Sequence, residues 1–199
     1  MQLGEVNTED DADESDTLLN AVQYKECVLT VPFRRDLLDL PVTEISRFAL
    51  EVVEAEGPIH THEIARRIRE AFGLQKTGKR ILAHVKSSLN HLSRSGSVAR
   101  DKEFWSMVGQ TLPAARSRRN AALALRRATM IAPNEYQLAV LTIISEAVAI
   151  SGDDLVVETA RLFGFDRTGP DLKEAIDRQA ERLLKDGRLH RDEDGFRFP

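Results

Sequence analysis

The feature that most constrains this chain is an internal repeat. Residues 72–78 and 163–169 share phenylalanine, glycine, threonine and glycine at matching positions, and an offset of 91 residues aligns them. The same offset, without a gap, aligns further identical or similar residues over about sixty positions. These pairs are Glu44 with Glu135, Ile59 with Ile150, Val85 with Ile176, Leu92 with Leu183, Gly96 with Gly187, Arg100 with Arg191 and Asp101 with Asp192. Such a match is hard to obtain by chance, so the chain should contain two copies of one structure.

Three stretches of the first copy have the pattern of amphipathic helices. Their apolar side chains recur every three or four residues, the period of a helix with one buried face. The three stripes are Ile45, Phe48, Ala49, Val52 and Val53; Ile64, Ala65, Ile68, Ala71 and Phe72; and Ile81, Val85, Leu89 and Leu92. The first helix is expected to stop at Gly57-Pro58, because proline disfavours a helix before it. Gly73 and Ser95-Gly96 end the other two, and Thr61 is the expected N-cap of the second helix. The pattern therefore predicts three consecutive helices.

A small β-hairpin is predicted after the third helix, because residues 97–100 and 103–107 flank the polar pair Asp101-Lys102. Three helices followed by a hairpin are the order of a winged helix, a variant of the helix-turn-helix. The second copy repeats this order, with helices near 134–147, 153–163 and 170–186 and a hairpin through residues 189–198. The predicted fold class is mainly α with small β-hairpins (α+β), arranged as tandem winged-helix repeats.

Charge and composition divide the chain into five predicted segments. These are a disordered acidic tail (1–17), an extended lead-in (18–40), winged-helix repeat 1 (41–109), a basic linker (110–132) and winged-helix repeat 2 (133–199). The tail has seven acids, no base and few apolar residues to offset the entropy of ordering. A weak alternation over residues 21–32 is compatible with a strand. The linker carries five arginines and no acid, so it either extends a cationic surface or is simply solvated.

Several short stretches resemble a known family, domain-of-unknown-function family 3320, which occurs at the C-terminal end of large bacterial helicase-like proteins of superfamily 1. The stretches are residues 54–60 (EAEGPIH), 63–68 (EIARRI), 72–74 (FGL) with 77–78 (TG), 131–133 (IAP), and 163–165 (FGF) with 167–169 (RTG). The resemblance implies an accessory module of a DNA helicase or nuclease system, with such an enzyme as its partner. It implies no catalytic residue in this chain, and the 199 residues contain no motor sequence.

The sequence also predicts a cytoplasmic protein without a membrane partner. Its longest strongly apolar stretch, residues 138–150, is shorter than the roughly 18 residues that a membrane span requires. The N-terminus carries acids where a signal peptide carries bases. A single cysteine, Cys27, allows no internal disulfide, which is typical of a reducing compartment.

No enzymatic or metal chemistry is expected. Residues 73–79 match the first seven positions of a Walker A phosphate loop, but Arg80 stands where the Mg²⁺-binding Ser or Thr belongs, and a helical pattern precedes the loop instead of a strand. Four histidines, at positions 60, 62, 84 and 91, have no cysteine or clear carboxylate beside them that would complete a metal site. We therefore predict no catalytic residue, no metal and no cofactor.

The outer face of the third helix is the predicted functional site. If Ile81, Val85 and Leu89 face inward, the opposite face presents cations interspersed with small and amide side chains. Lysine and arginine hold phosphates, and asparagine or arginine can read base edges in a major groove. The predicted DNA-binding residues, including one before this helix and one at the hairpin tip, are Lys76, Lys79, Arg80, Lys86, Ser87, Asn90, Arg94 and Lys102.

The second copy has the opposite charge on the corresponding face. Asp171, Glu174 and Glu181 would repel phosphate there, so this copy is expected to be structural or to bind a partner. Its first helix is apolar on nearly every side over residues 138–150, which predicts packing against the first copy, the linker or a second chain, that is, a homo-oligomer. The alternative for the whole chain is a protein-interaction adaptor whose winged helices mediate assembly without DNA contact.

Overall fold

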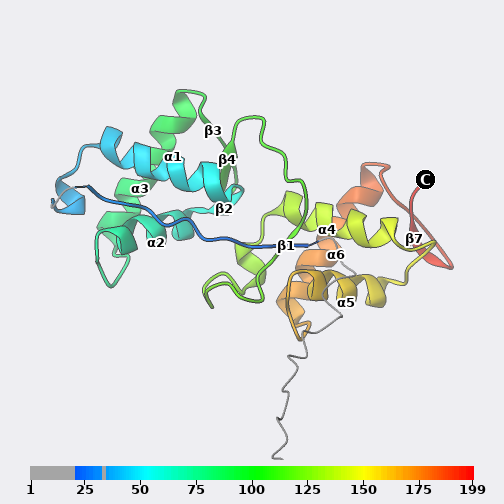
Figure 1. Cartoon of the computed structure of the whole chain (residues 1–199). Coiled ribbons are helices and arrows are strands. Elements are labelled where there is room, and N and C mark those ends of the chain that lie inside the picture. Colours follow the sequence, from blue (N-terminus) through cyan, green and yellow to red (C-terminus); the bar gives the residue numbers. More distant parts are fainter. Residues whose placement is uncertain (1–20, 33–34) are drawn as a thin grey trace, which may run out of the picture.

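The structure is a computed structural model that describes residues 21–32 and 35–199; the predicted acidic tail lies outside these residues. The described chain is about half helical, with small sheets, which confirms the mixed α and β class (Figure 1). The first unit consists of α1 (Val42–Glu56), β2 (Ile59–His60), α2 (Thr61–Ala71), α3 (Lys79–Arg94), β3 (Val98–Asp101) and β4 (Phe104–Met107). The second unit consists of α4 (Pro133–Ser145), α5 (Gly152–Leu162), α6 (Pro170–Lys185), β6 (His190–Asp192) and β7 (Gly195–Arg197).

The 91-residue offset of the sequence reappears in the geometry of the two units. Adding 91 to the first and last residue numbers of α2 gives those of α5, and adding 91 to those of α3 gives those of α6. The same shift relates the strand pairs, since Ile59 lies opposite Trp105 in the first unit and Ile150 lies opposite Phe196 in the second. The hairpin pair of Arg100 and Trp105 likewise becomes Arg191 and Phe196. The two units thus share the bounds of their second and third helices and their strand register, although α4 ends two residues before the position that matches the end of α1 and the second unit reduces β2 to a single bridge.

Each unit buries its own cluster of apolar side chains. The first core contains the predicted inward stripes of the three helices, together with Trp105 of β4 and Leu29, Leu37 and Leu40 from the segment before α1. The second core is formed by α4, α5 and α6 with Leu189 and Phe196, and Ala115 and Ile131 of the linker pack into it. α4 ends at Ser145, short of the apolar stretch that continues to Ile150. α4 packs against α5 and α6 and against Ala115 and Ile131 of the linker, while its Leu138 and Leu141 are only half-buried.

Two local details differ from the expectations. The N-cap of α2 is His60, whose Nδ1 accepts a hydrogen bond from the His62 backbone N–H; Thr61 is not the cap. Thr61 instead donates to the carbonyl of Glu103 and accepts from Trp105 Nε1, so it joins α2 to the hairpin. In the described part of the lead-in, only β1 (Val22–Gln23) is a strand, and it pairs in parallel with β5 (Arg116–Ser117) of the linker.

The linker arginines are the largest departure from the predicted organisation. Arg116 and Arg118 are buried and converge on Glu135 of α4, so they neither extend a cationic surface nor lie in solvent. Arg116 also donates from Nη1 to the carbonyl of Glu56 (2.6 Å) and from Nη2 to that of Pro58 (3.1 Å). The Glu56 carbonyl is the last of α1, and a cation at this end of a helix is favourable. Arg116 therefore connects the two units directly.

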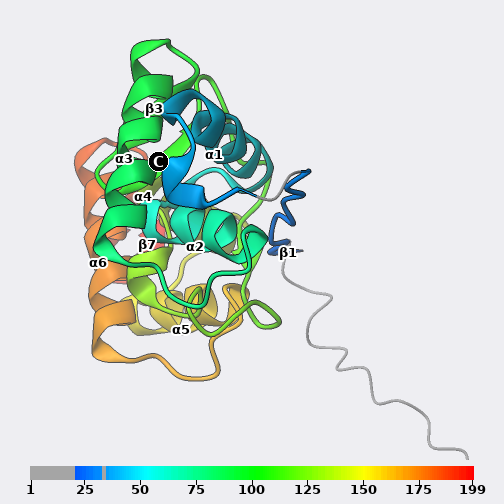
Figure 2. The ribbon, with the colours of Figure 1, turned by 90° about the vertical axis from the view of Figure 1, so that its left-hand side faces the viewer.

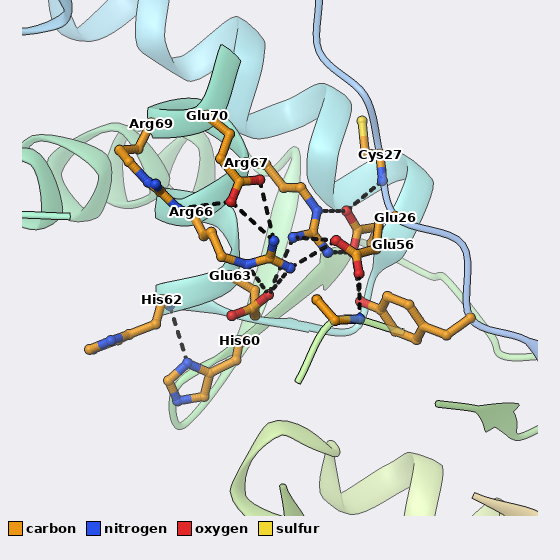
Figure 3. Close-up of polar contacts among 12 residues, drawn as sticks. Glu26, Cys27, Glu56, His60, His62, Glu63, Arg66, Arg67, Arg69 and Glu70 are labelled. Atoms are coloured by element: carbon orange, nitrogen blue, oxygen red, sulfur yellow. Dashed lines mark hydrogen bonds and ion pairs between the residues drawn. The ribbon is translucent and has the colours of Figure 1, made fainter. Parts of the chain in front are cut away.

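A second buried ionic cluster holds the lead-in against the first unit (Figure 3). Glu56, at the end of α1, accepts hydrogen bonds from Arg67 Nε (2.6 Å), from Arg67 Nη2 (2.8 Å) and from the Tyr24 hydroxyl (2.7 Å). Burial would lower the pKa of the Arg67 guanidinium, but its contacts with Glu56 raise it. Burial, together with the nearby charge of Glu56, raises the pKa of Tyr24. This cluster fixes the chain that pairs with β5, and hence the path between the units.

No helix within residues 21–32 and 35–199 combines the length and the apolar character that crossing a membrane requires.

Candidate nucleic-acid interface

α3 is held in the first unit by one apolar face that packs against α1. Val85 and Leu89 on this face are fully buried. The helices approach closely at two serines, since Ser46 donates to the Ser88 carbonyl at 3.3 Å and Ser88 donates back to the Val42 carbonyl at 3.3 Å. The buried stripe fixes the rotation of α3 about its axis, and the opposite side of the helix faces solvent.

All eight residues predicted to contact DNA are exposed. Across its sixteen residues α3 carries four lysines or arginines, two histidines and no acid. In the part of the chain that the structure describes, no carboxylate forms an ion pair with Lys79, Arg80, Lys76 or Lys102. Their charges are thus available to a ligand.

The first turn of α3 combines two features that favour an anion. Gly78 precedes the helix and provides no side-chain cap, so the first backbone N–H groups have no partner from that residue. The first turn contains Lys79 and Arg80 and no acid. Cations at this end of a helix oppose its dipole and destabilise it slightly, whereas a bound phosphate would relieve the conflict.

The turn between α2 and α3 is braced by a residue that sequence analysis missed. Arg69 donates from Nη1 to the carbonyls of Leu74 and Gln75, both at 2.9 Å. Gly73 has φ +68°, and a Cβ added to it would meet no atom of the described residues within 4 Å, so this turn is open on its outer side. Arg69 therefore holds Lys76 next to the start of α3; its spacing in an otherwise ordinary helix gave no signal of this role.

The hairpin tip combines an unpaired cation with an acid that is already paired. Lys102, which forms no ion pair with a described residue, occupies the turn with φ +55°. Glu103, which sequence analysis did not weigh, lies 3.1 Å from Arg100 Nη2 and 3.7 Å from Lys86 Nζ. Although the slight burial of Glu103 raises its pKa, the charges of Lys86 and Arg100 outweigh this and lower it. Lys86 is thereby partly neutralised, and Lys102 remains the principal cation of the tip.

The corresponding face of the second unit differs at each of these points. α6 begins with Pro170 and Asp171, and its sixteen residues include four acids and four bases. Glu174 pairs with Arg178, and Glu181 pairs with Arg191 at 3.0 Å. The turn before α6 is covered by the linker, because a Cβ on Gly164 would lie 2.6 Å from the Arg119 backbone nitrogen. Of the two described units, only the first therefore has an open, basic turn and helix.

A cleft of about 450 Å³ lies between the two units. Its floor is apolar and includes Phe104, Ile131 and Tyr136. His60, Lys102 and Glu103 line it from the first unit, and Asp171, Glu174 and Arg178 line it from α6. The hairpin tip and the charged face of α6 are thus neighbours across this cleft.

The structure also places the histidines and the segment that resembles a Walker A loop. Among the described residues there is no group of three or more His, Cys, Asp or Glu side chains placed to hold a metal ion. His60 is partly buried beside Phe104, and this burial, followed by the charge of His62, lowers its pKa. The Gly73–Lys79 segment follows helix α2, whereas a phosphate loop of the Walker type follows a strand.

A family model described as "Protein of unknown function (DUF3320)" matches residues 35–83, from the residues before α1 to the first turns of α3. This match supports the resemblance seen in the sequence over that part of the chain. No curated protein matches the chain, and no solved structure matches it.

Proposed function

We propose that this chain is a non-enzymatic DNA-binding module built from two winged helices, and that it contacts duplex DNA through α3 and the β3–β4 hairpin. The observation that carries the proposal is the charge difference on a repeated scaffold. α3 exposes cations and no acid, whereas α6, at the matching position of the second unit, exposes four acids. If α3 and α6 were both only solvated, acids would be expected on both helices.

The exposed face of α3 has the side chains that a helix in a major groove uses. Lys79, Arg80 and Arg94 supply cations for phosphates. Ser87 and Asn90 lie among them on the exposed side, and an asparagine can pair with the edge of an adenine. Lys102 at the hairpin tip would contact the backbone beside the groove. In this arrangement the cations provide affinity and Asn90 provides base recognition.

The winged-helix assignment is supported by the strand between the first two helices. β2 pairs with β4, which gives a three-stranded sheet of order β2-β4-β3 beside the three helices. The second unit has the same order of elements, with the Ile150–Phe196 bridge in place of the β2–β4 pairing. A helix-turn-helix of this kind positions its last helix for a groove and its hairpin for the flanking backbone.

The resemblance to family 3320 supports a role beside a helicase or nuclease, since such domains accompany helicase-like enzymes. We place the protein in the cytoplasm on the basis of its single cysteine. In this role the module would hold DNA while a separate enzyme performs the chemistry.

An adaptor that binds only protein is the second candidate. The mixed charges of α6 and the apolar floor of the cleft favour it, because protein contacts use such surfaces. An adaptor would show no phosphate-driven affinity.

A retardation assay on random-sequence 24-base-pair duplex DNA separates the two candidates. With about four phosphate contacts, affinity should fall roughly 100-fold between 50 and 200 mM salt. An absence of binding at 50 mM salt would overturn the DNA-binding proposal in favour of the adaptor.

A further inference from the structure

α6 and α3 lie on the same side of the molecule (Figure 2). Both helices follow the left-hand edge of the structure in this view, with α3 nearer the viewer and α6 behind it and lower. The cleft places Asp171, Glu174 and Arg178 of α6 opposite Lys102 and Glu103 of the hairpin tip. A DNA molecule that contacts α3 and continues past Lys102 would therefore approach α6.

Some of the charged side chains that line this cleft form ion pairs and others do not. Glu174 neutralises Arg178 by an ion pair, while Asp171 and Lys102 form no ion pair with any described residue. Asp171 and Glu174 line the same cleft as Lys102, so they oppose a phosphate that approaches Lys102 at low salt, and screening weakens this effect as salt rises.

The cleft is also too small to admit duplex DNA, whose major groove alone is about 12 Å wide. Its walls are held in place by Arg116, which donates to carbonyls of the first unit and pairs with Glu135 of the second. The acidic wall thus has a fixed position relative to the hairpin tip.

We propose that Asp171 and Glu174 limit the DNA segment that this protein binds. They repel phosphate near the hairpin tip, and Glu174 keeps the charge of Arg178 neutralised, so contact is confined to α3, the turn before it and the hairpin, and does not extend onto α6. This proposal rests on the DNA-binding function proposed above. It makes α6 a determinant of how much DNA the chain engages, in addition to its part in the second core.

The test uses the full chain and a double variant, Asp171→Asn with Glu174→Gln. The matched control is Glu193→Gln with Asp194→Asn, which removes two charges from the exposed turn between β6 and β7, at the end of the second unit far from α3 (Figure 1). Affinity for 8-, 12-, 16- and 24-base-pair duplexes is measured by fluorescence anisotropy between 50 and 200 mM salt. Circular dichroism verifies that both variants are folded.

The double variant should bind the 24-base-pair duplex about tenfold more tightly at 50 mM salt, with a salt slope steeper by up to about 0.9, because Arg178 becomes available and two repelling charges are removed. The gain should disappear for the 8-base-pair duplex. The control should change affinity less than threefold. An equal gain in the control, or no gain in the double variant, would overturn the proposal.

A further substitution distinguishes local competition from bulk charge. Arg178→Ala should have little effect in the otherwise unchanged protein, but should remove roughly half of the gain in the double-variant background. If Arg178→Ala has the same effect in both backgrounds, the proposal is wrong. If neither the unchanged protein nor any variant binds DNA, the proposed function itself fails.

Discussion

Arg116 and Glu135 form a buried ion pair, with 2.8 Å between Nη2 and Oε2, at the junction of the two units. Arg118 binds the same carboxylate from Nη1 at 2.9 Å and from Nη2 at 2.8 Å. Arg116 also donates to carbonyls at the end of α1 and after it, so this ion pair fixes the position of one unit relative to the other. The relative placement of α3 and α6 depends on it.

Substitution of Glu135 should destabilise the protein strongly. Glu135→Gln leaves two buried guanidinium groups without this countercharge, and breaking a buried pair costs about 3–5 kcal/mol. The free energy of unfolding, measured in urea, should fall by about 3 kcal/mol. Glu146→Gln, at the exposed end of α4, is the control and should change it by less than about 0.5 kcal/mol. Equal effects of the two substitutions would show that the buried pair does not stabilise the fold.

The same carboxylate predicts a pH dependence. Burial alone would raise the pKa of Glu135, but Arg118 and Arg116 outweigh it and lower the pKa from 4.5 to about 2. A lowered pKa contributes stability that is complete above the unfolded-state value and is lost as pH falls toward the folded-state value. The unfolding free energy should thus decline between about pH 5 and pH 2. Glu135→Gln should show a smaller decline over this range, and an identical decline would refute this assignment.

Removal of Lys79 should change stability and DNA affinity in opposite directions. Lys79 opposes the dipole at the start of α3, so Lys79→Ala should raise the unfolding free energy by about 0.3–1 kcal/mol. Lys185 lies in the last turn of α6, where a cation interacts favourably with the helix dipole. Lys185→Ala should therefore lower the unfolding free energy by a similar amount. Thermal unfolding measures both. DNA affinity should decrease for Lys79→Ala, so a variant that loses both stability and affinity would contradict the account.

The purified protein should hydrolyse no ATP, with or without DNA. The glycine-rich segment that matches most of a Walker A loop follows helix α2, and Arg80 occupies the position of the Mg²⁺ ligand. Phosphate release is measured with a coupled assay. Turnover above background that Lys79→Ala abolishes would show that the loop binds nucleotide.

The sequence predicted the helices well because their signals are local. The periodic apolar stripes around Ile45, Val85 and Leu89 form the buried faces of their helices. Gly73 and Gly96 follow helix ends and have positive φ, as expected. The repeat predicted α5 and α6 through their counterparts in the first unit. These features depend on short-range periodicity and on residues with special backbone geometry.

The junction could not be predicted, since it depends on contacts far apart in the chain. A run of arginines without acids has the pattern of a solvated or DNA-binding linker, yet Arg116 and Arg118 find their partner in Glu135 of α4. The role of Arg69 depends on two carbonyls in a turn that only the folded chain places beside it. Tertiary pairing of charges leaves no periodic signal in a single sequence.

The salt dependence of DNA affinity tests the central claim, that α3 binds DNA and α6 does not. Lys79→Ala with Arg80→Ala removes two exposed cations, so the slope of log affinity against log salt should fall by up to about 2. Arg178→Ala, on the matching face of α6, should leave affinity within about threefold, because Glu174 already neutralises this arginine. If Arg178→Ala weakens binding as much as the α3 double substitution does, both units share the DNA and the account is wrong.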